Sequence, residues 1–210
     1  AEHTGAHVHI AHVARKGAID IIRQYKAKGV NVTSEVTVHH LTLTDEACAT
    51  YNPATRVSPP LRSWDHVQAM REAVLDGTVD AIVTDHAPHA PEEKDVEFRY
   101  APCGFCGLET SLGVMLTDLY HTNIFDLKTI ISKMSCEPSK LFKLERGTLA
   151  EGAVADITIM DLNKEWTVDS SKFYTRGKFT PYEGKECKGK AVATMLAGKF
   201  VMRDGVVCAK

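Results

Sequence analysis

The sequence has no apolar run that approaches the roughly 18 residues needed to cross a bilayer. Its first residues, AEHTGAHVHIAHVARK, also lack the basic-then-apolar layout of a secretory signal. Its 25 lysines and arginines are balanced by 27 aspartates and glutamates, so the formal charge is −2 and no concentrated basic face is expected. These absences argue against nucleic acid and membrane partners and predict a cytoplasmic protein that acts on a small molecule.

A disulfide framework and a four-thiolate zinc site are not expected either. The six cysteines are scattered along a chain that is 44% hydrophobic and can form a sizeable core, so reduced thiols are the simpler prediction. Only Cys103 and Cys106 form a CxxC pair, and the second pair that a structural zinc site requires is missing.

Strand and helix patterns alternate over the first 90 residues. Residues 7–13, 30–38 and 79–83 are short, apolar and rich in β-branched side chains, and each is predicted to be a strand. Residues 15–29 and 64–77 have helical spacing, and Ser63 is placed to cap the second of these helices. The alternation predicts a parallel sheet with helices packed outside it, whose chemistry lies at the C-terminal ends of the strands.

Most of the metal-binding side chains fall at those ends. His12 lies at the end of the first predicted strand and His39 and His40 at the end of the second, and the stretch TDHAPH, with Asp85, His86 and His89, follows the third. Imidazole and carboxylate are ligands that suit zinc, so the sequence predicts a metal-dependent hydrolase. The simpler alternative is that each histidine is a hydrogen-bonded structural group.

Strand geometry separates neighbours within this set. Adjacent strand residues face opposite sides, so His40 is predicted to point away from a site that contains His39. By the same argument, His9 and His12 are predicted to point to opposite faces, and His9 is interpreted as a packing residue.

The second half of the chain changes character. Residues 108–121 are predicted to be a helix, and residues 126–144 are predicted to be helices broken near Pro138. Short strands are predicted at residues 155–162, 165–168 and 191–205, with a hairpin turn at Gly198.

Several motifs, taken in order, resemble the dihydroorotase family of cyclic amidohydrolases, in the bacterial class related to hydantoinases and allantoinases. They are SEVTVHHLTLTDE, VSPPLR, TDHAPH, APCGFCGLET, GAVADITIMDL and TRGKFTPYEGKECKGKAV. The resemblance implies an α/β fold, the C-terminal part of a TIM-like (β/α)8 barrel over residues 1–148. It also implies a small β-sandwich tail over residues 149–210.

The same resemblance implies roles for individual residues. His12 and His39 would bind one metal ion, and Asp85 would bind the other and act as general base and acid. His89, with the backbone around Pro102 and Gly104, would hold the substrate carboxylate. The resemblance also implies a contact to the substrate ring at Ser58, where the family usually has asparagine. Arg62 matches a family position and is assigned a structural role, and His40 and His86 are interpreted as supporting residues.

Two family features are not found in this sequence. The early HxH motif and the bridging lysine or aspartate that complete the metal centre have no counterpart, because the only HxH, His7–His9, directly precedes His12. We therefore predict that the chain is the C-terminal portion of the enzyme, inactive alone. Of the two Zn²⁺ ions expected in the full site, this portion would hold at most one, weakly. Its open sheet edges would pair with the missing N-terminal half or with a second copy.

Three functions follow from these patterns. The first is dihydroorotase, the reversible cyclisation of N-carbamoyl-L-aspartate to L-dihydroorotate in de novo pyrimidine biosynthesis. The second is another cyclic amidohydrolase of the hydantoinase or allantoinase type, which His89 argues against. The third is a non-catalytic scaffold, for instance for aspartate transcarbamoylase, which some dihydroorotases bind; the joint presence of His12, His39, Asp85 and His89 argues against it.

Overall fold

The computed structural model describes residues 1–208 and divides them into two compact units. The first unit contains Ala1–Ser111 and Val168–Lys185, and the second contains Leu112–Thr167 and Glu186–Lys210. Each unit therefore takes segments from both halves of the chain. The boundary expected between residues 148 and 149 stays a prediction.

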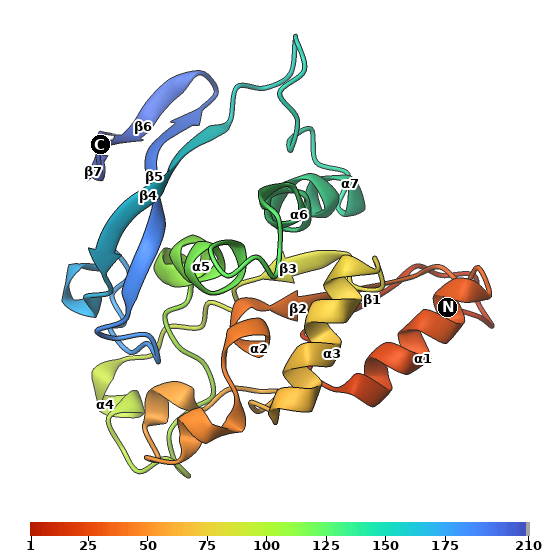
Figure 1. The fold of residues 1–210 in the computed structure, drawn as a ribbon, viewed down its shortest axis with the longest axis horizontal. Coiled ribbons are helices and arrows are strands. Elements are labelled where there is room, and N and C mark those ends of the chain that lie inside the picture. Colours follow the sequence, from red (N-terminus) through yellow and green to blue (C-terminus); the bar gives the residue numbers. More distant parts are fainter. Residues whose placement is uncertain (209–210) are drawn as a thin grey trace. The chain divides into compact units, whose positions relative to one another are not determined.

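The first unit is built on a parallel sheet of three strands. The strands are β1 (Val8–Ile10), β2 (Val32–Thr37) and β3 (Ala81–Val83), and they lie in the order β1-β2-β3. Helices α1 (Lys16–Ala27) and α3 (Trp64–Leu75) connect them and pack against each other (Figure 1). The predicted alternation of strand and helix, and the parallel pairing, are confirmed.

The helices form where apolar side chains recur on one face. Ile19 and Ile22 of α1 are buried, and the helix ends before Gly29, whose positive φ of 75° stops it. Helix α3 buries Val67, Met70 and Val74. Ser63 occupies the N-cap position of α3, but its hydroxyl bonds to the Asp65 carboxylate and not to the helix backbone, so the predicted side-chain cap is wrong.

The remaining helical segments of the first unit are single turns in the connections. One of them, α2 (Val38–Thr42), follows β2 directly, so the last residue of the strand, Thr37, is also the N-cap of this helix. The others are η1 (Asp45–Cys48), η2 (Pro53–Thr55), α4 (Pro91–Lys94) and η5 (Ser170–Lys172).

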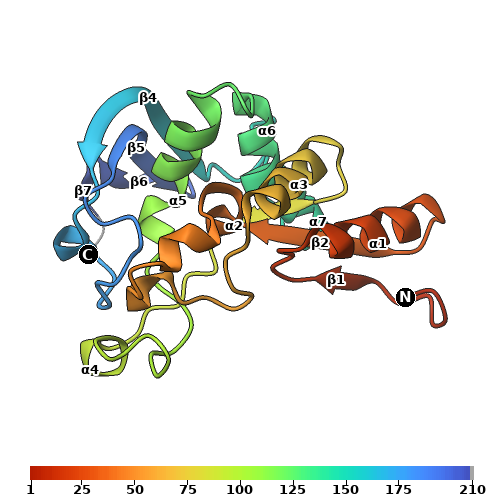
Figure 2. The same ribbon diagram turned by 60° about the horizontal axis from the view of Figure 1, so that its bottom comes forward.

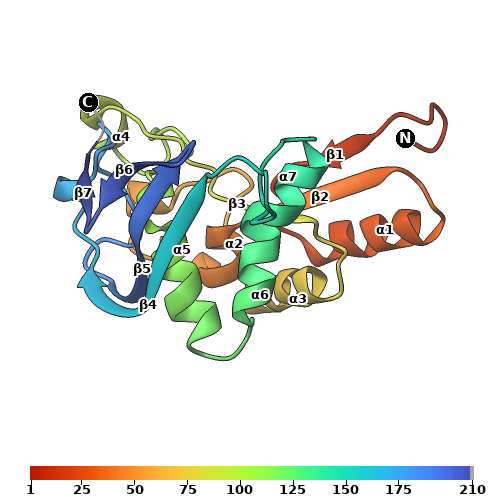
Figure 3. The same cartoon turned by 90° about the horizontal axis from the view of Figure 1, so that it is seen from above.

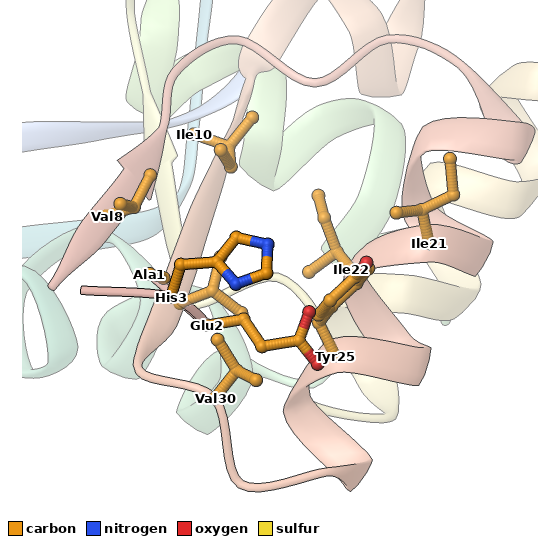
Figure 4. A pocket seen from close by; sticks show the side chains of 10 residues that line it. Ala1, Glu2, His3, Val8, Ile10, Ile21, Ile22, Tyr25 and Val30 are labelled. Atoms are coloured by element: carbon orange, nitrogen blue, oxygen red, sulfur yellow. The ribbon is translucent and has the colours of Figure 1, made fainter. Parts of the chain in front are cut away.

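Strand β1 forms the edge of this sheet, and a groove lies beside it. In Figure 2, β1 and β2 run side by side with α1 next to them. The groove, about 320 Å³ in volume, is bordered by Val8 and Ile10 of β1 and by Ile21, Ile22 and Tyr25 of α1 (Figure 4). Ile21 is 56% exposed and Ile10 37% exposed, so apolar surface faces solvent at this edge.

The second unit combines a helical run with an antiparallel sheet. Helix α5 (Leu108–Met115) begins in the first unit and continues as a π-helical turn, η3 (Leu116–Tyr120). Helices α6 (Leu127–Ile131) and α7 (Glu137–Leu141) are joined by another π-helical turn, η4 (Ser132–Cys136). Pro138 lies in the first turn of α7, directly after η4, so the predicted break near Pro138 corresponds to this π-helical interruption of the α-helical run.

The sheet of the second unit has the strand order β4-β5-β6-β7. Figure 3 shows the antiparallel neighbours β4 (Ile157–Thr167), β5 (Glu186–Leu196) and β6 (Lys199–Arg203), which are followed by β7 (Val206–Val207). The two strands predicted at 155–162 and 165–168 are one strand, because irregular register between Asp161 and Glu165 keeps β4 paired with β5. Ala197 and Gly198, both at positive φ, form the predicted hairpin turn.

Over the described residues, 1–208, none of the helices has the length and apolar character required to cross a membrane.

Close packing at Gly113 provides a test of the second unit. A methyl group added at Gly113 of α5 would overlap the indole ring of Trp166, whose Nε1 donates a 3.0 Å hydrogen bond to the Gly189 carbonyl. We expect Gly113→Ala to lower the free energy of unfolding by about 1–3 kcal/mol because the held ring cannot move aside freely. Urea unfolding measures the change.

Gly17→Ala in α1 is the matched control. Nothing lies within 4 Å of a methyl group added at Gly17, and α1 is helical there. The control is expected to be neutral or to stabilise by up to about 1 kcal/mol. Equal stability of the two variants would contradict the packing at Trp166.

Candidate active site

The second strand ends in a turn of helix that separates two adjacent histidines. The Thr37 hydroxyl accepts a hydrogen bond from the His40 backbone N–H at 3.2 Å and so caps α2. His39 and His40 are therefore helical. The prediction that they are the last residues of a strand is wrong. The alternation argument used to separate them does not apply, although the structure does give them different environments.

His40 is fully hydrogen-bonded by its surroundings. Its Nε2 donates to the Pro59 carbonyl at 3.1 Å, which leaves Nδ1 to accept from the Thr37 hydroxyl at 2.7 Å. Burial lowers the pKa of His40 to about 4, so the ring is neutral near pH 7. The packing role predicted for His40 agrees with these contacts.

His39 is buried without any such partners. Its side chain is 1% exposed, and among residues 1–208 neither ring nitrogen has a hydrogen-bond partner. Burial, followed by the neighbouring His40 and His12, holds the pKa of His39 well below its usual value. A neutral imidazole with two unsatisfied nitrogens in the interior is unfavourable unless something binds it, as a metal ion would.

One carboxylate joins two histidines beside β1. Glu35 of β2 places Oε2 3.0 Å from His9 Nε2 and Oε1 2.8 Å from His12 Nδ1. The alignment at His12 is not that of a hydrogen bond, and within the described chain its Nδ1 has no such partner. His12 lies beyond the end of β1 with a positive φ of 53°, so the chain has left the strand and both histidines reach Glu35. The prediction that they point to opposite faces is wrong.

Asp85 follows β3 and meets His12. Its Oδ1 lies 3.4 Å from His12 Nε2, and its φ is 50°. Burial raises the pKa of Asp85; the charge of Glu35 raises it further, while His12 opposes both effects. His12 and Asp85 thus share an uncommon left-handed backbone just past a strand end, a conformation often found at functional sites.

The donors suit zinc in kind but do not form a complete set in this chain. His12, His39 and Asp85 provide nitrogen and carboxylate ligands, and the unsatisfied nitrogens of His39 and His12 are available to a cation. However, no three histidine, cysteine, aspartate or glutamate side chains among residues 1–208 are grouped closely enough to hold a metal ion. The predicted ligand roles stay predictions.

The segment predicted to contact the substrate carboxylate packs against His89. His89 Nε2 donates to the Cys103 carbonyl at 2.9 Å. Gly104 has a φ of 120°, and a methyl group added there would lie 2.5 Å from the Ala87 Cβ and 3.3 Å from His89 Nε2. Only glycine fits this close approach, so Pro102 and Gly104 lie in a segment directly beside His89.

Three other predicted residues have distinct environments. Ser58 is exposed and precedes Pro59, whose carbonyl accepts the His40 hydrogen bond. Among the described residues, the Arg62 backbone N–H donates to no predicted site residue. The Arg62 carbonyl accepts a hydrogen bond from the Asp45 N–H. His86 Nδ1 accepts from the Leu108 N–H at 3.1 Å at the start of α5, so the structure shows a contact to a helix and none to a predicted ligand.

Sequence reasoning missed Glu35, Lys94 and Arg56. Glu35 is 7% exposed on a buried strand rich in β-branched residues, and a lone acid within such a strand is a signal that could have identified it. Lys94 and Arg56 bind the backbone near Pro102, and their positions in polar loops gave no comparable signal.

Comparisons with known proteins identify the family that this chain resembles. A profile of the Amidohydrolase family matches residues 1–201. A dihydroorotase from Syntrophus aciditrophicus is 49% identical over 97% of this chain and 48% of its own length. A dihydroorotase from Pelotomaculum thermopropionicum is 47% identical over 99% of this chain and 48% of its own length. The resemblance found in the motifs is confirmed, and the chain spans about half the length of these curated relatives.

The solved structures that match are related cyclic amidases. An L-hydantoinase (dihydropyrimidinase) from Arthrobacter aurescens superposes with a TM-score of 0.93 and 31% identity, covering 98% of this chain and 47% of that one. A D-hydantoinase from a Thermus species has a TM-score of 0.88 and 26% identity, covering all of this chain and 47% of that one.

The two buried histidines are expected to respond oppositely to the same substitution. His40→Leu would remove the ring acceptor of the Thr37 hydroxyl proton and the ring donor to the Pro59 carbonyl, and should cost about 2–4 kcal/mol of stability. His39→Leu removes two unsatisfied nitrogens at similar volume and should change the stability of metal-free protein by less than about 1 kcal/mol, or raise it. Urea unfolding in a chelator measures both, and a large loss for His39→Leu would contradict the environment described for His39.

Proposed function

The chain belongs to the amidohydrolase family, and from this we propose that it is the C-terminal portion of a dihydroorotase. The reaction is the reversible cyclisation of N-carbamoyl-L-aspartate to L-dihydroorotate in pyrimidine biosynthesis. Identities of 47–49% to dihydroorotases, against 31% to a hydantoinase of known structure, support this substrate over hydantoins. On this proposal the parallel sheet continues a (β/α)8 barrel, and the antiparallel sheet belongs to a β-sandwich.

The observation that carries the proposal is the meeting of His12 and Asp85 at 3.4 Å, with His39 buried and unsatisfied after the adjacent strand. A scaffold would gain no stability from an unpartnered buried imidazole or from two left-handed residues at strand ends. A hydrolase can use both as ligands and as proton carriers.

His12, His39 and Asp85 would hold Zn²⁺ together with ligands from outside this chain. A bound zinc ion supplies Lewis-acid chemistry, polarising the ring carbonyl and lowering the pKa of water to about 7. Two ions are proposed for the full site and at most one, weakly held, for this chain, because the described donors form no complete set.

Asp85 carries the proton in this mechanism. In hydrolysis, its carboxylate takes a proton from the attacking water and gives it to the ring nitrogen as the amide bond breaks. In cyclisation, it takes the proton from the attacking ureido nitrogen and gives it to the departing oxygen.

His89 and the segment around Pro102 and Gly104 would bind the carboxylate of the substrate. The Nε2–H of His89 bonds to the Cys103 carbonyl, which fixes the ring against this segment. A fixed protein group that binds the carboxylate orients the reacting ring. Neither a free amide nor a hydantoin has this carboxylate. Ser58 is proposed to contact the ring from its exposed position before Pro59.

The proposed partners are the N-terminal portion of the same protein or a second copy, and the exposed apolar edge at Ile10 and Ile21 supports a covering partner. Binding to aspartate transcarbamoylase, and location in the cytoplasm, stay predictions.

Replacing the proton carrier tests the mechanism. In the full-length protein, Asp85→Asn keeps the size of the side chain but cannot accept a proton, and we expect kcat for dihydroorotate to fall at least about 100-fold. Asp95→Asn, ten residues further along in the exposed part of the same loop, is the control and should retain activity. The rate is measured from loss of the ring absorbance with zinc supplied.

A substrate panel separates the alternatives. Full-length protein is expected to hydrolyse dihydroorotate and to leave hydantoin and allantoin intact, whereas the isolated 210-residue chain should turn over none of them because its ligand set is incomplete. Preference for hydantoin would favour the hydantoinase alternative, and inactivity of zinc-loaded full-length protein toward all three would favour a scaffold.

A further inference from the structure

Lys94 is a buried cation that the mechanism above does not use. It ends the short helix α4, and its side chain is 0% exposed, the largest of the fully buried side chains. Its Nζ donates a 2.7 Å hydrogen bond to the Pro102 carbonyl. Among residues 1–208 no carboxylate lies within ion-pairing distance of Lys94. A buried ammonium without a counter-charge is costly, so its position calls for a physical explanation.

The explanation lies in how the segment 98–104 is held. The Arg56 guanidinium donates to the carbonyls of Phe98, Arg99 and Ala101. Lys94 binds the next carbonyl, that of Pro102, and His89 binds the one after it, that of Cys103. Donors from three side chains therefore fix the carbonyl groups of this segment.

This arrangement sets the direction of one backbone N–H. In a trans peptide the carbonyl and the following N–H point in opposite directions, so the Cys103 N–H points away from Lys94. Within the described chain this N–H has no acceptor, whereas the next N–H, that of Gly104, bonds back to the Arg56 carbonyl at 2.9 Å. A cation on the carbonyl polarises the peptide and strengthens its N–H as a donor.

We propose that Lys94 is a positioning residue: its ammonium aims the Pro102–Cys103 peptide at the substrate's carboxylate and supplies positive charge behind it. This rests on the proposed function, since it assigns the anion to the segment beside His89. Lys94 touches no reacting atom and acts through the peptide.

The charge state of Lys94 gives the proposal a pH signature. Burial, together with the nearby Arg56 charge, lowers the pKa of Lys94 to about 8 even though the Cys103 and Cys106 thiols act in the opposite direction. The ammonium is lost as pH rises through about 8, while the neutral amine still donates one N–H. Because the folded pKa is below that of the unfolded chain, deprotonation does not weaken the fold between pH 8 and 10.5. A loss of binding in this range would therefore not come from unfolding caused by Lys94 deprotonation.

The test is anion binding to zinc-loaded full-length protein and its Lys94→Met variant. Orotate and its neutral amide differ only at the carboxylate, so they separate charge from shape. We expect Lys94→Met to weaken orotate binding about tenfold and to change amide binding by less than about twofold. The KM for dihydroorotate should rise by a similar factor while kcat stays within about twofold.

Two results would overturn the proposal. Unchanged orotate affinity would show that Lys94 has no influence on the anion, and equal weakening of orotate and amide would show that it only maintains the fold. Wild-type turnover of dihydroorotate in the same preparation keeps the proposed function separate, because its absence would refute the dihydroorotase assignment, whatever the variant does.

A second measurement decides the matter if Lys94→Met does not fold. Orotate affinity is measured from pH 7 to 9.5 in a Cys103→Ser background, which removes the nearest titrating thiol. We expect affinity to fall as pH rises through about 8. A flat profile would contradict the proposal.

Discussion

Parallel pairing of β1, β2 and β3 is the constraint on which the candidate site depends. Because the three strands run in the same direction, their C-terminal ends lie at one edge, and the chain leaves each strand next to its neighbours. His12, His39 and Asp85 each lie two residues past one of these strand ends. The strand ends lie next to one another because of the backbone hydrogen bonds between the strands, and not because of contacts between these side chains.

The sequence was sufficient to predict that His12 and Asp85 lie together, but not the local geometry around them. Apolar runs and helical spacing placed β1, β2, β3, α1 and α3 correctly, because hydrophobic burial decides both their existence and their direction. The errors occur where a single polar contact overrides periodicity. Thr37 caps a turn of helix and takes His39 and His40 out of the strand, and a left-handed His12 brings it to the same carboxylate as His9. Lys94 was missed because its burial depends on a carbonyl eight residues away, which no short pattern encodes.

The adjacent histidines show how a fold can separate stability from chemistry. Both ring nitrogens of His40 are hydrogen-bonded, one to Thr37 and one to Pro59, and so connect two segments of the chain. His39 is similarly buried, but both of its ring nitrogens are unsatisfied. Identical residue types one position apart are therefore expected to differ in their contribution to the stability of the metal-free protein. The dihydroorotase relatives at 47–49% identity are consistent with a site in which such unsatisfied groups have a use.

The left-handed backbone at His12 and Asp85 also limits how this site can change over evolutionary time. At positive φ a β-branched residue is strained, while asparagine, aspartate, histidine and glycine are accommodated. The residues that the backbone tolerates therefore overlap with those that can bind a metal ion or carry a proton. Drift at these positions would tend to pass through asparagine or glycine, so a relative could lose catalysis while keeping the loop intact, and its fold alone would not reveal the loss.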